Sequence, residues 1–410
     1  MTGRGMTISG KSPRILYVTS VCPYGPSYGA RLRVLNIGRL LGRLGRVTLV
    51  IAGAKDIAPD SLAKARNDFE QVHIARVGHE GLRGFRERIR FETDPSFLNT
   101  RFSAVSDEER VNLRRLQSEH DVTWVHRIQT ANEFRMFRWP HAAIDIDDIP
   151  SRFYASRAKS GSSLVESLLN ARMSLIWRRR EKLLKDRFDA LCVCSEDDRR
   201  YLGDGSGLHV VPNGFSPPDR TPVRKPASPP RLGFIGTFEY QPNQRGVDWF
   251  IKSVWPRVRR AVPDSRLRLV GLGSDTGYSS RGPGIDGLGY LGDPADEIAS
   301  WSAMIVPVLA GGGTRIKIAE AFGRLCPVVA TSLGAFGYDV ADGVDLLLAD
   351  RPRDFAAACV RLMTDPLLGP RLSASAWDKS RRDWTWDSRE PAVAEVVEDC
   401  LTSGDRLGYK

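Results

Sequence analysis

The sequence predicts an α/β protein of two domains, each built on a doubly wound parallel sheet. Three observations predict this fold class: apolar runs of strand length alternate with helical patterns, the alternation occurs twice, and a proline-rich stretch at 216–230 separates the two halves. The 410 residues suffice for two cores of ordinary size, and a chain with 41% hydrophobic and 27% charged residues is typical of a globular protein.

The first half opens with a strand, a loop, a helix and a second strand. Arg14–Ser20 is an apolar strand, a loop rich in proline and glycine follows it, helical leucine spacing runs over Leu32–Leu44, and Val47–Ala52 is the next strand. Further strands are expected at Val72–Val77 and Val122–His126. Because the first loop lacks a G-x-G-x-x-G fingerprint, we do not expect a dinucleotide site there.

Two arginines at the start of the first helix, Arg31 and Arg33, have two alternative interpretations: contacts to a phosphate, or charges on the surface of the helix. A strand over Ala143–Asp148 ends in the carboxylates of Asp145, Asp147 and Asp148, and carboxylates at a strand end can bind a divalent metal.

The first half then continues through a helix and a final strand. A long basic helix is expected over Phe153–Asp189, followed by a strand at Ala190–Ser195 whose last residue caps a short helix. Val210–Gly214 is a strand and turn before the linker.

The second half repeats the alternation of strand and helix. Arg231–Gly236 is a strand, Trp249–Pro263 is a helical pattern, and Arg266–Val270 is the next strand. Gly236 ends the first of these strands and allows the backbone to approach a ligand. A final helix over Arg389–Leu401 closes the chain.

The region around Ile305 carries the clearest chemical pattern. A buried strand over Met304–Val308 leads to three consecutive glycines, Gly311, Gly312 and Gly313, and then to a helix from Thr314 and a strand over Pro327–Ala330. Glycines expose backbone N–H groups, and a helix capped by Thr314 directs its positive end toward an anion. With Arg315 and Lys317 in the first turn, this loop is predicted to bind phosphate.

The stretch from Ile305 to Gly337 contains three motifs in order: GGGTR-x-K-x-x-EA, PVV-x-T and GA-x-G. Together they resemble the nucleotide-sugar site of retaining glycosyltransferases of family 4 type, which are also described as glycosyl transferases group 1. The resemblance implies the GT-B fold, in which two Rossmann-like domains face an interdomain cleft. It is strong in the second half and loose between Ala58 and Ser118.

The resemblance implies a role for several residues. Glu320 matches the glutamate that holds the donor ribose, His126 matches a histidine that contacts the donor sugar, and Gly29 matches a glycine of the first loop. Arg245 lies where the family often has a lysine that binds diphosphate, and Gly334 follows the second buried strand in a loop that can line the sugar pocket.

The expected sites and domains follow from these patterns and from the resemblance. We expect catalytic roles for His126, Arg315, Lys317 and Glu320, donor binding by Gly29, Gly236, Arg245, Gly311, Gly312, Gly313, Thr314 and Gly334, and neither a metal nor another cofactor. In the branch that this sequence resembles, Asp145, Asp147, Asp148 and Ser151 belong to a domain without metal, so we expect them to shape the acceptor pocket or to cap the next helix. The expected domains are a tail at 1–12, an acceptor domain at 13–215, a linker at 216–230, a donor domain at 231–385 and a helix at 386–410 that crosses back to the first domain.

The resemblance implies transfer of a sugar from a nucleotide diphosphate sugar to an acceptor hydroxyl, with retention and in exopolysaccharide or other surface glycan biosynthesis. The donor diphosphate is expected to assist removal of the acceptor proton, while His126 stabilises the developing charge. One alternative is a nucleotide-sugar epimerase on the same fold. Another is an inactive sugar-nucleotide-binding scaffold, because Gly312 and Glu239 stand where the family has a glutamate and an arginine.

The net charge of +11 is concentrated in Arg83–Arg90 and Arg152–Arg187. No nucleic-acid-binding motif accompanies these clusters, so we expect either contact with an anionic membrane and a lipid-linked or soluble glycan acceptor, or simply a solvated helix face. The sequence has no apolar run of about 20 residues and no signal-peptide core, which predicts a cytoplasmic protein that can associate with the inner face of the plasma membrane. Six scattered cysteines support neither a zinc site nor a disulfide framework.

Overall fold

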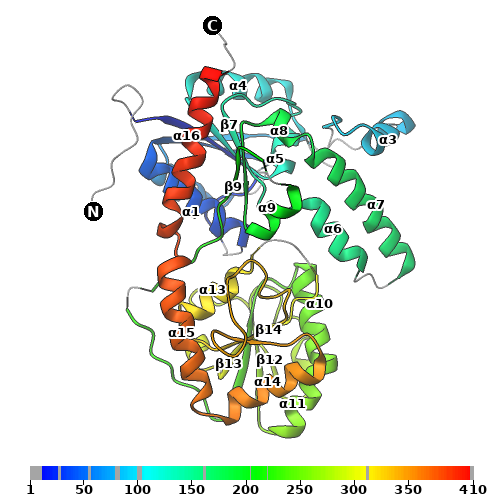
Figure 1. The fold of residues 1–410 in the computed structure, drawn as a ribbon, viewed down its shortest axis with the longest axis vertical. Coiled ribbons are helices and arrows are strands. Elements are labelled where there is room, and N and C mark those ends of the chain that lie inside the picture. Colours follow the sequence, from blue (N-terminus) through cyan, green and yellow to red (C-terminus); the bar gives the residue numbers. More distant parts are fainter. Residues whose placement is uncertain are drawn as a thin grey trace. The chain divides into compact units, whose positions relative to one another are not determined.

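The structure, a computed structural model, describes residues 12–25, 29–53, 57–78, 84–98, 104–159, 163–203, 205–218, 220–310 and 314–406. Contacts divide the chain into a first unit, Met1–Pro212 with Arg389–Lys410, and a second unit, Asn213–Ser388. Each unit is a parallel sheet with helices packed against it (Figure 1). The predicted fold class, two α/β domains with parallel sheets, is confirmed.

The first unit contains a seven-stranded sheet in the order β3-β2-β1-β6-β7-β8-β9, and every pairing in it is parallel. Its strands are β1 (Arg14–Thr19), β2 (Arg46–Ala52), β3 (Gln71–Ala75), β6 (Val122–His126), β7 (Ala142–Asp145), β8 (Ala190–Val193) and β9 (Leu208–Val210). The strands are continuous apolar runs because helices cover both faces of a parallel sheet. Leu16, Val125 and Ile144 are examples of fully buried core residues.

The helices of the first unit include α16 at the chain's end, which packs on α1 and on β6 to β9 (Figure 1). They are α1 (Gly29–Leu44), α2 (Pro59–Asp68), α3 (Gly84–Thr93), α4 (Asp107–Glu119), α5 (Ile128–Glu133), α6 (Pro150–Lys159), α7 (Leu164–Glu181), α8 (Leu184–Arg187), α9 (Glu196–Leu202) and α16 (Glu390–Arg406). Two short strands, β4 (Val77–Gly78) and β5 (Ala104–Val105), form a separate antiparallel pair.

The second unit contains a six-stranded sheet in the order β12-β11-β10-β13-β14-β15, again parallel throughout. Its strands are β10 (Arg231–Ile235), β11 (Arg266–Val270), β12 (Ile285–Gly287), β13 (Ala303–Val306), β14 (Val328–Ala330) and β15 (Leu347–Leu348). Its helices are α10 (Gln241–Trp249), α11 (Trp255–Ala261), α12 (Ala295–Ala299), α13 (Ile316–Phe322), α14 (Pro352–Thr364) and α15 (Leu368–Asp383).

The order of strands is the same in both units and identifies one position in each sheet. In the first sheet, β1, β2 and β3 follow one another toward one edge, and β6, β7, β8 and β9 follow one another toward the other edge. In the second sheet, β10, β11 and β12 run toward one edge and β13, β14 and β15 toward the other. Ligands of such sheets bind at the carboxyl ends of the strands where the order reverses. These positions are the β1/β6 edge of the first unit and the β10/β13 edge of the second.

Two predicted helices differ from the structure. The single helix expected over Phe153–Asp189 is wrong, because the segment holds α6, α7 and α8, and the Ser163 hydroxyl caps α7 by accepting from Glu166 N at 3.1 Å. The helix expected from Trp249 begins instead at Gln241 and passes through a π-helical turn at Phe250–Val254 before it continues as α11. That turn precedes Pro256, which has no N–H to donate to the helix.

The proline-rich segment 216–230 belongs to the second unit and is hydrogen-bonded within it. Lys225 N donates to Ala299 O and Ala227 N donates to Ser300 O, both at 2.9 Å, and the division between the units falls upstream of this segment, between Pro212 and Asn213. Across the described residues, no helix combines the length and the apolar character needed to span a membrane.

Candidate functional site

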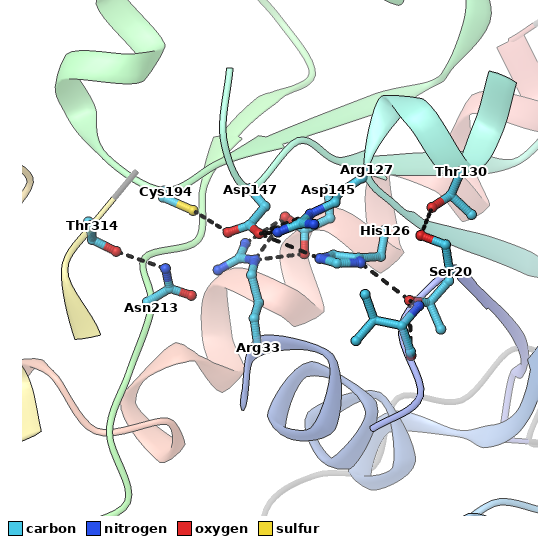
Figure 2. A network of polar contacts seen from close by, with 12 residues as sticks. Ser20, Arg33, His126, Arg127, Thr130, Asp145, Asp147, Cys194, Asn213 and Thr314 are labelled. Atoms are coloured by element: carbon cyan, nitrogen blue, oxygen red, sulfur yellow. Dashed lines mark hydrogen bonds and ion pairs between the residues drawn. The ribbon is translucent and has the colours of Figure 1, made fainter. Parts of the chain in front are cut away.

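His126 occupies the β1/β6 edge of the first unit. It is the last residue of β6, and its Nδ1 lies 3.3 Å from the hydroxyl of Thr19, the last residue of β1. The next residue, Ser20, accepts a hydrogen bond from Thr130 of α5 at 2.9 Å (Figure 2). His126 therefore ends a strand, as the sequence predicts, and the strand order of the sheet reverses at that strand.

His126 is fully buried, and its other nitrogen faces a carboxylate. Nε2 lies 3.7 Å from Asp147 Oδ2, which is too long for a hydrogen bond. Burial lowers the pKa of His126 below its ordinary value, and although Asp147 opposes this effect, the nearby Arg127 adds to it. The imidazole is therefore neutral at pH 7, and the carboxylate favours the tautomer that has its proton on Nε2.

Arg127 and Asp147 form an ion pair next to this histidine. Arg127 Nη2 donates to Asp147 Oδ2 at 2.8 Å, and Nε donates to the same oxygen at 3.2 Å. Burial alone would raise the pKa of Asp147, but the Arg127 guanidinium holds it well below its usual range. Both members of the pair have positive φ angles, 73° and 56°, and such strained backbone is concentrated at functional sites.

Arg33 makes a second ion pair, with Asp145 at the end of β7. Both side chains are fully buried, Arg33 Nε lies 2.9 Å from Asp145 Oδ2, and Nη2 lies 2.6 Å from Oδ1 (Figure 2). Arg33 Nη1 also donates to Val211 O at 3.0 Å. Burial lowers the pKa of Arg33, but Asp145 more than offsets this and raises it. The interpretation of Arg33 as a surface charge is therefore wrong.

The acidic stretch after β7 is divided among different partners. Asp145 and Asp147 are bound to arginines, and Ser151 donates to Glu181 and lies 3.0 Å from Tyr201 Oη. Because α6 begins at Pro150, Ser151 is inside the helix and does not cap it. Within the described ranges, no three His, Cys, Asp or Glu side chains are grouped so as to hold a metal ion.

Lys317 occupies the β10/β13 edge of the second unit. From the first turn of α13 its Nζ donates to Asn243 Oδ1 at 3.0 Å and lies 3.9 Å from the centre of the Phe234 ring in β10. A Cβ added to Gly236, the residue after β10, would be 2.8 Å from Asn243 Nδ2 and 3.2 Å from Lys317 Nζ. The absence of a side chain at Gly236 therefore makes room for the lysine at the strand end.

The electrostatics of this edge bring the pKa of Lys317 into the neutral pH range. Burial, assisted by the like charge of Arg315, lowers the pKa of Lys317 to about 7, while Glu320 opposes the shift. Burial also raises the pKa of Glu320, although Arg324, 3.5 Å away, opposes that shift. An anion bound beside Lys317 would restore the lysine's full charge.

Thr314 does not cap α13, contrary to the prediction. The helix begins at Ile316, and the residue at its N-cap, Arg315, makes no side-chain cap hydrogen bond. With an extended Arg315 between them, the Thr314 hydroxyl is held away from the first turn and instead accepts from Asn213 Nδ2 at 2.8 Å (Figure 2). Gly311, Gly312 and Gly313, expected to bind phosphate, lie outside the described residues.

The remaining expected residues have well-defined positions. Gly334 N donates to Thr331 Oγ1 at 2.9 Å, and a Cβ on Gly334 would be 2.5 Å from Val306 O, so this loop packs tightly on β13. Arg245 lies in α10, two residues after Asn243, and Gly29 is the exposed first residue of α1.

Thr19, Arg127 and Asn243 belong to the two edges, but sequence reasoning did not select them. The only signal in the sequence was position, because Arg127 directly follows a strand and Asn243 follows Gly236 within a few residues. Their partners are distant in the chain, so local patterns could not reveal the contacts.

The chain is similar to a known protein family and to two named proteins. Residues 229–365 match the model of the family described as glycosyl transferases group 1. A Klebsiella pneumoniae protein, the uncharacterized 44.6 kDa protein in cps region, is 21% identical over 355 residues, which span 82% of this chain and 87% of that protein. The phosphatidyl-myo-inositol mannosyltransferase of Mycobacterium leprae is 28% identical over 215 residues, or 50% of this chain and 56% of that protein.

Solved structures support the fold over nearly the whole length of the chain. Sucrose-phosphate synthase from Thermosynechococcus elongatus aligns with a TM-score of 0.68 at 16% identity, covering 95% of this chain and 100% of that one. Anabaena HepE, solved in complex with UDP and glucose, aligns with a TM-score of 0.62 at 14% identity and covers 94% and 99%. The chain therefore has the GT-B fold, and its residues 229–365, which include Gly236, Lys317 and Glu320, are similar to the glycosyl transferases group 1.

Proposed function

We propose that the chain is a glycosyltransferase that moves a sugar from a nucleotide diphosphate sugar to an acceptor hydroxyl, with retention and without a metal ion. One observation carries the proposal: Lys317 lies partly buried at the β10/β13 edge, hydrogen-bonded to Asn243 beside Gly236, inside the segment that matches the family. A cation at this position neutralises the negative charge that grows on a departing diphosphate.

The other site residues take complementary roles in this proposal. Arg315, two residues before Lys317, supplies a second cation to the diphosphate, and Glu320 accepts hydrogen bonds from the donor ribose. The donor phosphate assists removal of the acceptor proton. His126, neutral and held between Thr19 and Asp147, stabilises charge that develops near the reacting carbon.

The biological setting that we propose is exopolysaccharide or other surface glycan biosynthesis, with a glycan or lipid-linked acceptor. The relative from Klebsiella that is named for a cps region supports this setting, and the HepE complex with UDP and glucose supports a nucleotide-sugar donor. The absence of a membrane-spanning helix among the described residues is compatible with an enzyme that reaches such acceptors from the cytoplasmic side.

The test is to incubate the purified full chain with UDP-, GDP- and dTDP-sugars, with and without EDTA, and to separate the products by chromatography. We expect slow release of nucleotide from one donor without an acceptor, unaffected by EDTA, and faster release once a suitable acceptor is added. The sugar of the product should keep its anomeric configuration.

The other outcomes would each overturn part of the proposal. Conversion of the donor into an isomeric nucleotide sugar would identify an epimerase. Donor binding without turnover across a panel of glycan and lipid-linked acceptors would identify a scaffold. Turnover that EDTA abolishes would contradict metal independence and would make Asp145, Asp147 and Asp148 candidate metal ligands again.

The pKa of Lys317 predicts that donor affinity falls as the pH rises. Binding of a diphosphate favours the charged lysine, so the affinity is fully present below the pKa of the free protein, about 7, and is lost above it. We expect the Kd of a nucleotide sugar to rise about tenfold per pH unit from pH 7 toward the pKa of the complex. Isothermal titration calorimetry in buffers of different ionisation enthalpy would measure both the Kd and the uptake of a proton at pH 8.

The variant Lys317→Arg provides the control for this pH dependence. Because a guanidinium stays charged throughout this range, the Kd of the variant should not change between pH 7 and 8.5. An equal pH dependence in the variant and in the parent would assign the titration to another group.

Gly236→Ala is expected to weaken donor binding, because its Cβ would be 2.8 Å from Asn243 Nδ2 and would displace the partner of Lys317. Overpacking of this kind costs about 1–3 kcal/mol of folding stability. Because the strain falls on the partner of Lys317, the Kd of the donor should rise. The matched control is Gly292→Ala, where nothing lies within 4 Å of the added Cβ. Equal donor affinity in the two variants would contradict a role for Gly236 at the donor site.

A further inference from the structure

Helix α7 carries a row of exposed aliphatic side chains. Leu164 is 76% exposed, Leu168 is 63% exposed and Leu175 is 62% exposed. These positions are four and seven residues apart and therefore share one face of the helix. Val165 and Leu169 widen this exposed face over the first two turns of α7, whereas buried residues of α7 such as Asn170 and Trp177 lie on the opposite side. In a globular protein, such a contiguous exposed apolar face marks an interaction site.

Basic residues are interleaved with this row. Arg172 follows Leu168 by four residues and Arg179 follows Leu175 by four, and both arginines are exposed. The neighbouring helix α3 has the same composition, with exposed Phe85 (77%) and its basic neighbours Arg86, Arg88 and Arg90.

The two helices form one surface. Arg172 Nε donates to Glu92 Oε2 at 3.0 Å, and Arg180 Nη2 donates to Phe91 O at 2.7 Å, so residues of α7 hold the end of α3. In Figure 1, α3 lies near α7, and α6 and α7 extend away from the sheet of the first unit. We call the exposed residues Phe85, Arg86, Arg88, Ile89 and Arg90 of α3 and Leu164, Val165, Leu168, Leu169, Arg172, Leu175 and Arg179 of α7 the α3/α7 surface.

We propose that the α3/α7 surface docks the protein on an anionic lipid membrane. Aliphatic and aromatic side chains enter the boundary between headgroups and acyl chains, while arginines among them keep their guanidinium groups at the lipid phosphates. The net charge of +11 adds attraction to a negatively charged leaflet. This inference does not depend on the proposed function, because lipid binding needs neither donor nor acceptor.

Charge and chemistry favour a membrane over the other occupants. In a symmetric dimer the same surface of both copies would meet, which would bring arginines against arginines. A nucleic acid would satisfy the arginines but would leave the exposed leucines, valine and isoleucine in water. An anionic membrane is complementary to both kinds of residue at once.

The experiment is flotation of the full chain with vesicles of phosphatidylglycerol mixed with phosphatidylcholine and with vesicles of phosphatidylcholine alone. We expect binding to the anionic vesicles that is at least ten times stronger and that weakens with salt. The triple variant Leu164→Gln, Leu168→Gln, Leu175→Gln should lose at least nine-tenths of this binding. Glutamine is a good helix former, and all three positions are exposed, so circular dichroism should be unchanged.

A second triple variant, Val111→Gln, Val223→Gln, Leu367→Gln, is the matched control, because it removes three side chains of similar exposure outside the α3/α7 surface. It should bind vesicles like the parent. The proposal is overturned if both triple variants bind equally, or if phosphatidylcholine vesicles bind as well as anionic ones. It is also overturned if light scattering shows a dimer that only the α7 variant dissociates, which would make the surface an interface between copies.

Discussion

Replacement of Arg33 by methionine is expected to lower the free energy of unfolding of the first unit by about 3–5 kcal/mol. The substitution leaves the Asp145 carboxylate fully buried without its two hydrogen-bonded nitrogens, at 2.6 and 2.9 Å, and leaves Val211 O without its donor. An unpaired buried charge costs more than the pair contributes, which is why the loss is large. Urea unfolding of the full chain, followed by circular dichroism, would measure it.

A double variant and a surface control separate the lost partner from lost packing. The double variant Arg33→Met, Asp145→Leu also removes the unpaired carboxylate, so the double variant should be more stable than Arg33→Met alone. Arg39→Met changes an exposed arginine of the same helix and should alter stability by less than about 0.5 kcal/mol. A loss below about 1 kcal/mol in Arg33→Met would contradict the assignment of a buried pair.

The burial of Arg33 is predictable from the sequence, but its partner is not. It stands four residues before Ile37 and seven before Leu40, so helical spacing places it on the buried face of α1. An arginine in that position needs an internal partner, and a carboxylate at a strand end is a natural one. The identity of the partner could not be predicted, because Asp145 is 112 residues away along the chain.

The sheets were largely predictable, because a strand covered on both faces leaves a continuous apolar run in the sequence. The expected strands Val122–His126 and Arg266–Val270 coincide with β6 and β11. The helical region after β7 was not predicted correctly, although Ser160-Gly161-Ser162-Ser163 is a strong turn signal and Ser163 caps α7. Basic side chains occur both in α6 and in α7, and this shared composition is typical of one continuous helix.

The candidate site was predictable only in part. The sequence predicts His126 and Lys317 as site residues, and the structure places each at the edge where the strand order of its unit reverses. Their contacts with Thr19 and Asn243 arise because parallel strands distant in the chain end at the same edge. The lowered pKa of Lys317 depends on desolvation, which the sequence alone does not determine.

Arg315→Ala is expected to lower the turnover number by about 100- to 1,000-fold once a donor and acceptor are known. Its guanidinium would balance charge that appears on the diphosphate only as the sugar leaves, so turnover should fall more than donor affinity. Steady-state kinetics of the full chain at saturating donor would measure the effect. Arg353→Ala, an exposed arginine of α14 in the same unit, is the control and should turn over like the parent.

A second measurement on the same variant connects Arg315 to Lys317. The positive charge of Arg315 is one reason why the pKa of Lys317 is lowered to about 7. Removing this charge should therefore move the midpoint of the pH dependence of donor binding above 7 in Arg315→Ala, whereas Arg353→Ala should leave it in place. If turnover stays near normal, Arg315 has no role in catalysis. If turnover falls but the midpoint does not move, the charge of Arg315 does not lower the pKa of Lys317, and the midpoint must be attributed to desolvation alone.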